Sequence, residues 1–126
     1  MLGRMGNGGE LEVAGGLAIV TLRGELDAHD APRLREMFAG ALERASAAGG
    51  HPRLVLDLSA VDFLDSSALG AMVGALRRTR EAGGELAVVL PEGQARRIFE
   101  ITGLEGVLDV RETREEALTG ARLPAD

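Results

Sequence analysis

The chain has no Cys, Lys, Trp or Tyr, and each absence excludes a class of function. Without Cys there is neither a disulfide framework nor a thiolate metal site. Without Lys there is no catalytic lysine and no phosphate-binding lysine of the Walker A type. With three Phe as the only aromatic side chains, few rings are available for stacking on nucleic-acid bases. All 14 basic residues are Arg, they are spread along the chain, and the net charge is −6, so we expect no nucleic-acid partner.

Long apolar runs are also missing. No segment approaches the roughly 20 apolar residues that a membrane-spanning helix needs, and residues 1–10 lack the apolar core of a signal peptide. We therefore expect a cytoplasmic protein with no membrane partner. The 126 residues have an ordinary globular balance, with 45% hydrophobic and 27% charged residues, which suits one domain with its own core.

Turn signals and apolar periodicity divide the chain into the elements of a small α/β domain. We expect the Gly-rich residues 1–10 to be disordered, residues 11–120 to form the domain and residues 121–126 to fray. Apolar segments on both sides of Gly15-Gly16 predict a hairpin, and further strands are predicted at 54–58, 85–90 and 107–110. Helices are predicted from about residue 31, from residue 66, and at 94–101 and 113–118. This order predicts a mixed sheet of four to five strands with about four packed helices.

The segment 61–70 joins the most apolar predicted strand to a helix. The apolar stripe of this helix has spacings of three and four and consists of Leu69, Met72, Val73 and Leu76. At about 100° per residue, Ser66 lies near the stripe, whereas Ser67 lies about 170° from its centre. We therefore predict that Ser66 caps the helix and that Ser67 is presented to solvent.

Small residues continue the face on which Ser67 is predicted to lie. Ala71 and Gly74 follow at one and two turns, before Arg78, where a solvent-facing helix normally carries Glu, Lys or Gln. Because Gly inside a helix costs about 0.5–1 kcal/mol relative to Ala, we expect a neighbouring element or another protein to come close to this face.

Loops after parallel strands meet at one end of a sheet, so Asp27 should lie there with the segment 61–70.

Two enzyme-like arrangements are weaker interpretations. Asp27, Asp57, Asp62 and Asp65 could form a divalent-ion or phosphoacceptor site, but a receiver-like domain relies on a Lys that the chain lacks. We favour two loop carboxylates, one helix cap and one strand-end residue. A Ser with His29 and an Asp could form a hydrolase triad, but the Gly-x-Ser-x-Gly pattern is missing and His29 fits a solvated turn. We therefore expect no catalytic residues, no cofactor and no metal.

A Ser presented at a helix N-terminus is, in contrast, a good phosphoacceptor. The helix dipole and the free N–H groups tolerate the added negative charge, so phosphorylation need not unfold the domain. The same charge and bulk would disrupt a contact face built from Ala and Gly. The pattern therefore indicates a binding switch.

Four stretches carry a resemblance to a known family: Gly-Glu-Leu-Asp at 24–27, Leu-Asp-Leu at 56–58, Phe-Leu-Asp-Ser-Ser-Ala-Leu-Gly at 63–70 and Arg-Ile-Phe-Glu-Ile-Thr-Gly-Leu at 97–104. They resemble the anti-sigma-factor antagonists of the STAS domain family, over about residues 11–118. The Asp-Ser-Ser segment is the most specific part of this resemblance. One departure is Ala68, which stands where the family usually has Gly.

The resemblance implies a partner-switching protein. In the family, the unphosphorylated antagonist binds a serine-kinase anti-sigma factor, which then releases its sigma factor. The kinase uses its own ATP to phosphorylate the second Ser of Asp-Ser-Ser, matched here by Ser67, and a metal-dependent phosphatase of the PP2C type resets the antagonist. The position matched by Asp27 helps form the kinase-facing surface.

We combine this resemblance with the small-residue face to predict one partner-binding set: Asp27, Asp65, Ser66, Ser67, Ala71, Gly74 and Arg78. The alternative function is that of a STAS subunit in a stress-sensing or lipid-transport complex. There the same face would bind a constant partner and would not be phosphorylated.

Overall fold

The strands of the chain pair in the order in which they occur in the sequence. The computed structural model describes residues 2–4 and 9–119, and within them the sheet has six strands in the order β1-β2-β3-β4-β5-β6. They are β1 (Leu2–Arg4), β2 (Gly9–Ala14), β3 (Leu17–Leu26), β4 (Arg53–Leu64), β5 (Glu85–Val89) and β6 (Asp109–Arg111). The first three strands are antiparallel, and β3 to β6 are parallel. The predicted mixed sheet with an N-terminal hairpin is confirmed, with one strand more than expected.

The N-terminal segment differs from its prediction. Residues 1–10 were expected to be disordered, but they contain β1 and the first two residues of β2. β1 pairs with β2 from Leu2 opposite Glu12 to Arg4 opposite Glu10. The remaining positions of that segment, 1 and 5–8, lie outside the described residues, and so does the tail at 121–126 for which fraying is predicted.

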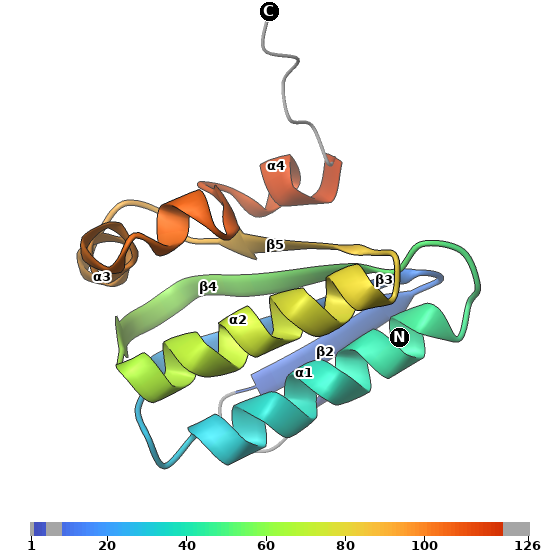
Figure 1. Cartoon of the computed structure of the whole chain (residues 1–126), viewed down its shortest axis with the longest axis horizontal. Helices are drawn as coiled ribbons and strands as arrows, with labels where there is room; N and C mark the ends of the chain where they lie inside the picture. Colours follow the sequence, from blue (N-terminus) through green and yellow to red (C-terminus); the bar gives the residue numbers. More distant parts are fainter. Residues whose placement is uncertain (1, 5–8, 120–126) are drawn as a thin grey trace, which may run out of the picture.

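Helices connect the strands and cover both faces of the sheet. They are α1 (Ala31–Ser46), α2 (Ser66–Glu81), α3 (Gln94–Thr102), the short 3-10 helix η1 (Leu104–Gly106) and α4 (Arg114–Thr119). α1 and α2 run side by side over one face (Figure 1). None of the described helices is long and apolar enough to cross a membrane.

Alternation along β4 assigns its side chains to the two faces. Leu54 and Leu56 belong to the main core, which also contains buried side chains of α1, α2 and α3. Val55, between them, belongs to a second and smaller apolar cluster that includes Ala117 of α4. α4 therefore packs on the face opposite to α1 and α2. Arg53, at the start of β4, donates hydrogen bonds to the carbonyls of Ala117 and Leu118 at the end of α4.

A partly buried ion pair also holds α4 on this second face. The Arg114 guanidinium contacts Asp57 Oδ2 at 2.8 Å and also donates to Glu12 at 3.1 Å and to Thr21 Oγ1 at 2.9 Å. Burial raises the pKa of the Asp57 carboxyl, but hydrogen bonds from Ser59 and Arg114 outweigh this effect. The pKa of Asp57 is therefore below its ordinary value. Asp57 joins β4 to α4 and is not part of a site at the end of the sheet.

Candidate functional site

The Asp-Ser-Ser segment lies where two paired strands end. β4 pairs with β5 only as far as Asp57, whereas its pairing with β3 continues to Leu64, which lies opposite Leu26. The prediction that β4 ends at residue 58 is therefore too short. The Asp65 N–H donates to the Leu26 carbonyl at 3.1 Å, so the turn that begins at Asp27 and the start of α2 leave the sheet together. The predicted location of Asp27 at this end of the sheet is confirmed.

Asp65 is the N-cap of α2. Its backbone is extended, and its Oδ1 accepts hydrogen bonds from the N–H groups of Ser67 at 2.9 Å and Ala68 at 3.1 Å. The prediction that Ser66 is the cap is wrong, because Ser66 is the first helical residue and is exposed. The Asp65 carboxylate satisfies two of the N–H groups that a helix start leaves without a partner.

The two serines differ in exposure, but not in the predicted direction. Ser66 is exposed and Ser67 is partly buried. The reason is that α2 packs against α1 as well as against the sheet. Its buried arc therefore includes a second stripe, of Ala68, Ala71 and Ala75. Of the predicted stripe, Leu69, Met72 and Leu76 are buried, whereas Val73 is only partly buried. The prediction that Ala71 lies on the outward face is wrong, since its side chain is 2% exposed.

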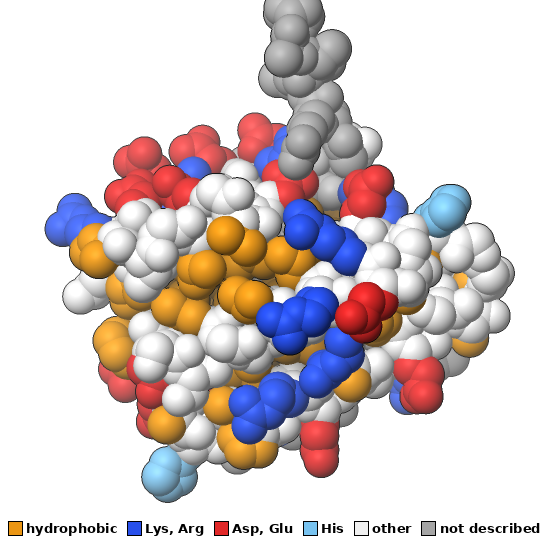
Figure 2. Space-filling model, in the orientation of Figure 1, with side chains coloured by type: hydrophobic (Ala, Val, Ile, Leu, Met, Phe, Trp, Pro, Cys, Tyr) orange, Lys and Arg blue, Asp and Glu red, His pale blue; other side chains and the backbone are white. Residues whose placement is uncertain are grey.

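Two glycines lie on the outer side of α2. Gly70 is exposed and Gly74 is partly exposed, and a Cβ atom at either position would have no atom within 4 Å. No element of the described chain therefore requires glycine there. Arg77 and Arg78 are exposed one turn beyond Gly74, and Figure 2 shows basic side chains in a row across the face that α1 and α2 form. We did not predict that Gly70 belongs to this surface. Gly70 lies one turn after Ser66, whereas the predicted surface was traced along the helix face of Ser67.

Asp27 shapes the turn between β3 and α1. Its Oδ1 accepts a hydrogen bond from the His29 N–H at 2.9 Å, and its own N–H donates to Asp30 Oδ2 at 2.9 Å. Both Asp27 and His29 are exposed, which confirms the solvated turn predicted for His29. The turn is thus ordered by its own hydrogen bonds, and the outer side of Asp27 remains available for a partner.

The enzyme-like arrangements receive no support from the geometry. Asp57 lies on the α4 face and Asp65 caps α2, so the four aspartates do not form one cluster. Within residues 2–4 and 9–119, no group of three or more His, Cys, Asp or Glu side chains could hold a metal ion. No described residue other than Gly has a positive φ, so neither serine has the strained backbone of a nucleophile elbow.

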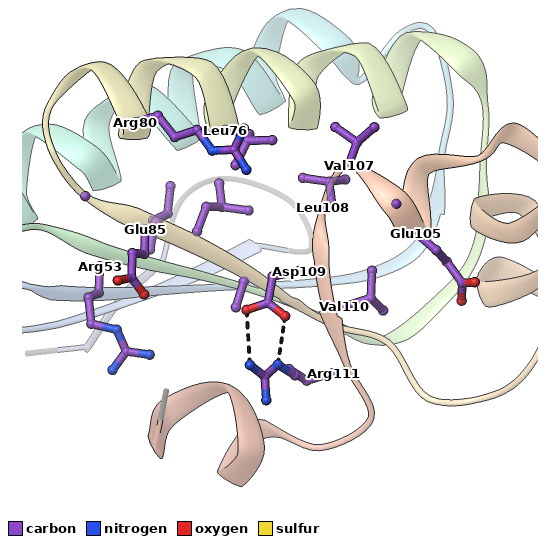
Figure 3. Close-up of a pocket in the computed structure, with 15 residues that line it drawn as sticks. Arg53, Leu76, Arg80, Glu85, Glu105, Val107, Leu108, Asp109, Val110 and Arg111 are labelled. Atoms are coloured by element: carbon purple, nitrogen blue, oxygen red, sulfur yellow. Dashed lines mark hydrogen bonds and ion pairs between the residues drawn. The ribbon is translucent and has the colours of Figure 1, made fainter. Parts of the chain in front are cut away.

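A groove lies at the other half of α2. It has a volume of about 620 Å³, and its lining includes Leu76 and Arg80 of α2 and the segment from Glu105 to Arg111 (Figure 3). Arg111 forms an ion pair with Asp109 at 2.8 Å, and Glu105 forms one with Arg96 at 2.7 Å. The groove begins more than two turns of α2 beyond the serines, so we do not include it in the candidate site.

Comparison with known proteins assigns the family. The family model of the STAS domain matches residues 10–117. The chain belongs to the STAS domain family. This STAS domain is 32% identical to an anti-sigma F factor antagonist of Paenibacillus polymyxa over 110 residues, which are 87% of this chain and 91% of the relative.

Solved structures agree with this assignment. The crystal structure of an anti-sigma factor antagonist from Mycobacterium paratuberculosis has a TM-score of 0.76 and 30% identity, with coverage of 90% of this chain and 92% of that one. The Bacillus cell fate determinant SpoIIAA in its phosphorylated form has a TM-score of 0.64 and 25% identity, with coverage of 90% and 99%. Within its family, the chain is thus similar to proteins named anti-sigma factor antagonists.

Ala68 is compatible with the local backbone. It is helical, fully buried and hydrogen-bonded through its N–H to Asp65. The position therefore does not need the positive φ that Gly would provide, and Ala is the better helix former.

Proposed function

We propose that this STAS domain is an anti-sigma factor antagonist that binds a serine-kinase anti-sigma factor and is switched off by phosphorylation of Ser67. The observation that carries the proposal is the Asp65-capped start of α2, which places the exposed Ser66 and the partly buried Ser67 before Gly70 and Gly74, whose outer side no described element covers. The names of the relatives and the phosphorylated form of SpoIIAA support the same function. Exposure alone favours Ser66, so the choice of Ser67 rests on its match to the second Ser of the family motif.

The proposed switch works through local charge and bulk. In the transfer, Ser67 Oγ forms a bond to the γ-phosphorus of the kinase's ATP, ADP leaves, and the hydroxyl proton passes to the kinase or to water. The phosphate adds a charge of about −1.5 to −2. In the free domain, the N-terminus of α2 tolerates that charge. In the complex, the phosphate and the neighbouring Asp65 carboxylate would both lose their water, which weakens binding. Release of the kinase follows, and a PP2C-type phosphatase restores the antagonist in the cytoplasm.

The test of this proposal is a phosphorylation assay with the cognate serine kinase, identified by native pull-down and mass spectrometry. The parent chain and Ser66→Ala should accept phosphate from Mg-ATP, whereas Ser67→Ala should not. Mapping of the phosphopeptide checks the position directly. Phosphate on Ser66, or undiminished labelling of Ser67→Ala, contradicts the assigned site. A stable partner without kinase activity, together with no phosphorylation, supports the alternative of a STAS subunit in a stress-sensing or lipid-transport complex.

Gly74 tests whether the kinase contacts the outer side of α2. Gly74→Ala should raise the free energy of unfolding by about 0.5–1 kcal/mol, because a Cβ there meets no atom within 4 Å. Gly74→Gln should also unfold at or above the parent temperature, but it should bind the kinase more weakly because the longer side chain enters the interface. Thermal melts and titration calorimetry separate the two effects, with Gly74→Ala as the matched control. Equal affinity of all three proteins would place Gly74 outside the interface.

A further inference from the structure

Phe63 is an aromatic side chain that the fold leaves partly exposed. The chain has three Phe and no Trp or Tyr. Phe38 and Phe99 belong to the main core and are 1% and 0% exposed, whereas Phe63 is 41% exposed. Each apolar side chain that is kept from the core forgoes the free energy of burial. Of the three Phe, Phe63 is therefore the one that keeps apolar surface for a contact outside the core.

Strand geometry prevents Phe63 from entering the core. The register shift next to Asp62 resets the alternation of β4. Beyond it, Leu64 and its partner Leu26 are buried in the main core, whereas Phe63 precedes Leu64 and lies opposite the exposed Glu25, so Phe63 points away from the side that α1 and α2 cover. Its backbone is held in β4, where Phe63 pairs with Glu25 of β3. The pairing of β4 with β5 ends at Asp57, so this part of the strand projects beyond β5. The side chain is thus displayed on ordered backbone, at a low entropic cost for binding.

Phe63 is also rigidly connected to the serines. Leu64 is 1% exposed, the Asp65 N–H is bonded to the Leu26 carbonyl, and the Asp65 carboxylate is bonded to the Ser67 N–H. Ser67 follows Phe63 by four residues, and four residues of fully extended chain span at most about 14 Å. A protein interface of standard size covers about 800 Å² on each partner, which corresponds to a disc of roughly 16 Å radius. An interface centred on Ser67 therefore reaches Phe63 if the partner sits over the end of the sheet.

We propose that Phe63 is the apolar anchor of the switch interface and that it inserts into an apolar pocket of the serine kinase next to the site that accepts Ser67. This inference rests on the proposed function and adds a docking direction to it: the kinase covers the end of the sheet at β3 and β4, and not only the outer side of α2. Buried aromatic side chains on rigid backbone are the residues that most often dominate the binding energy of an interface.

The experiment measures the affinity of the purified cognate kinase for three variants. Phe63→Thr removes the ring but keeps a residue that favours strands, and its dissociation constant should rise at least tenfold, as for a hot-spot residue. Phe63→Leu should recover part of the loss because it restores apolar bulk. Val107→Ala removes a side chain that is 46% exposed and lines the groove next to Leu76, more than two turns of α2 beyond the serines, and it should bind like the parent. Thermal melts confirm that each variant is folded.

The outcomes distinguish this inference from the proposed function. If the parent and Phe63→Thr bind the kinase equally and both are phosphorylated on Ser67, the anchor is overturned and the switch function stands. A loss of affinity in Val107→Ala as large as in Phe63→Thr would also overturn the anchor, since the effect would not be specific to the end of the sheet. If the parent neither binds a serine kinase nor accepts phosphate, both proposals fail. Should Phe63→Thr fail to fold, parent-like affinity of Phe63→Ala would contradict the anchor and a tenfold loss would support it.

Discussion

Ser67→Glu should fold like the parent and lose most of its affinity for the serine kinase. A carboxylate in the first turn of a helix interacts favourably with the dipole, by about 0.3–1 kcal/mol. The Asp65 carboxylate already accepts a hydrogen bond from the Ser67 N–H, so repulsion between the two charges should offset much of this gain. In the complex, the new charge is desolvated without a partner, which typically costs about 2–5 kcal/mol. The dissociation constant should therefore rise by a factor of roughly 30 or more.

Two matched variants isolate the charge and the position. Ser67→Gln adds similar bulk without charge and should bind more tightly than Ser67→Glu. Ser66→Glu places the same charge on the exposed neighbour, one residue earlier in the helix. Thermal melts and calorimetric titrations of the same samples measure stability and affinity together. If Ser67→Glu binds as tightly as the parent, Ser67 is not in the contact surface, and if only Ser66→Glu loses affinity, the switch residue is Ser66.

The order of elements and the location of the site were predictable from the sequence, because both follow from periodicity and topology. Alternating strand and helix patterns predict the parallel sheet, and parallel strands bring Asp27 to the segment that contains Ser67 although they are far apart in the chain. The bond from Asp65 to the Leu26 carbonyl agrees with this expectation. Such features require only the type of each element and not its detailed packing.

The outward face of α2 was not predictable in the same way. Ala is compatible with both a core and a surface, so the stripe of Ala68, Ala71 and Ala75 gave no signal that a second helix packs there. Contact with α1 widens the buried arc of α2 and moves its centre toward Ser67. The extension of β4 was missed for a related reason. The register shifts between β3 and β4 break the alternation, and Asp62 and Phe63 are both exposed, so the sequence there has the pattern of a loop.

The attachment of α4 was also missed, because Asp57 and Arg114 are distant in sequence and each has an ordinary local pattern. In their ion pair, the side chain of Asp57 is 8% exposed and that of Arg114 is 37% exposed. The pair lies on the face opposite to α2, so it should affect the stability of the domain without a direct effect on the kinase contact.

Asp57→Ala should lower the free energy of unfolding by about 1.5–3 kcal/mol, the range for hydrogen bonds to a charged group. The loss should not be larger, because the remaining Arg114 side chain is 37% exposed and keeps its contact with Glu12. Urea titrations of the parent and the variant at neutral pH measure the difference. Affinity for the serine kinase, measured under conditions in which the variant is folded, should stay at the parent value. A loss of stability below about 1 kcal/mol, the range of a surface pair, would contradict the structural role of this pair.

The pH dependence of stability gives an independent check on the same carboxylate. Because the folded state lowers the pKa of Asp57, its ionised form stabilises the fold. This contribution is fully present above the unfolded pKa of about 3.9 and is lost as the pH falls through the lower folded value. The parent should therefore lose more stability than Asp57→Asn when the pH is lowered from 5 to about 3, while the other carboxylates contribute equally to both proteins. Parallel curves for the two proteins over this interval would mean that the Asp57 carboxylate does not stabilise the fold through its charge.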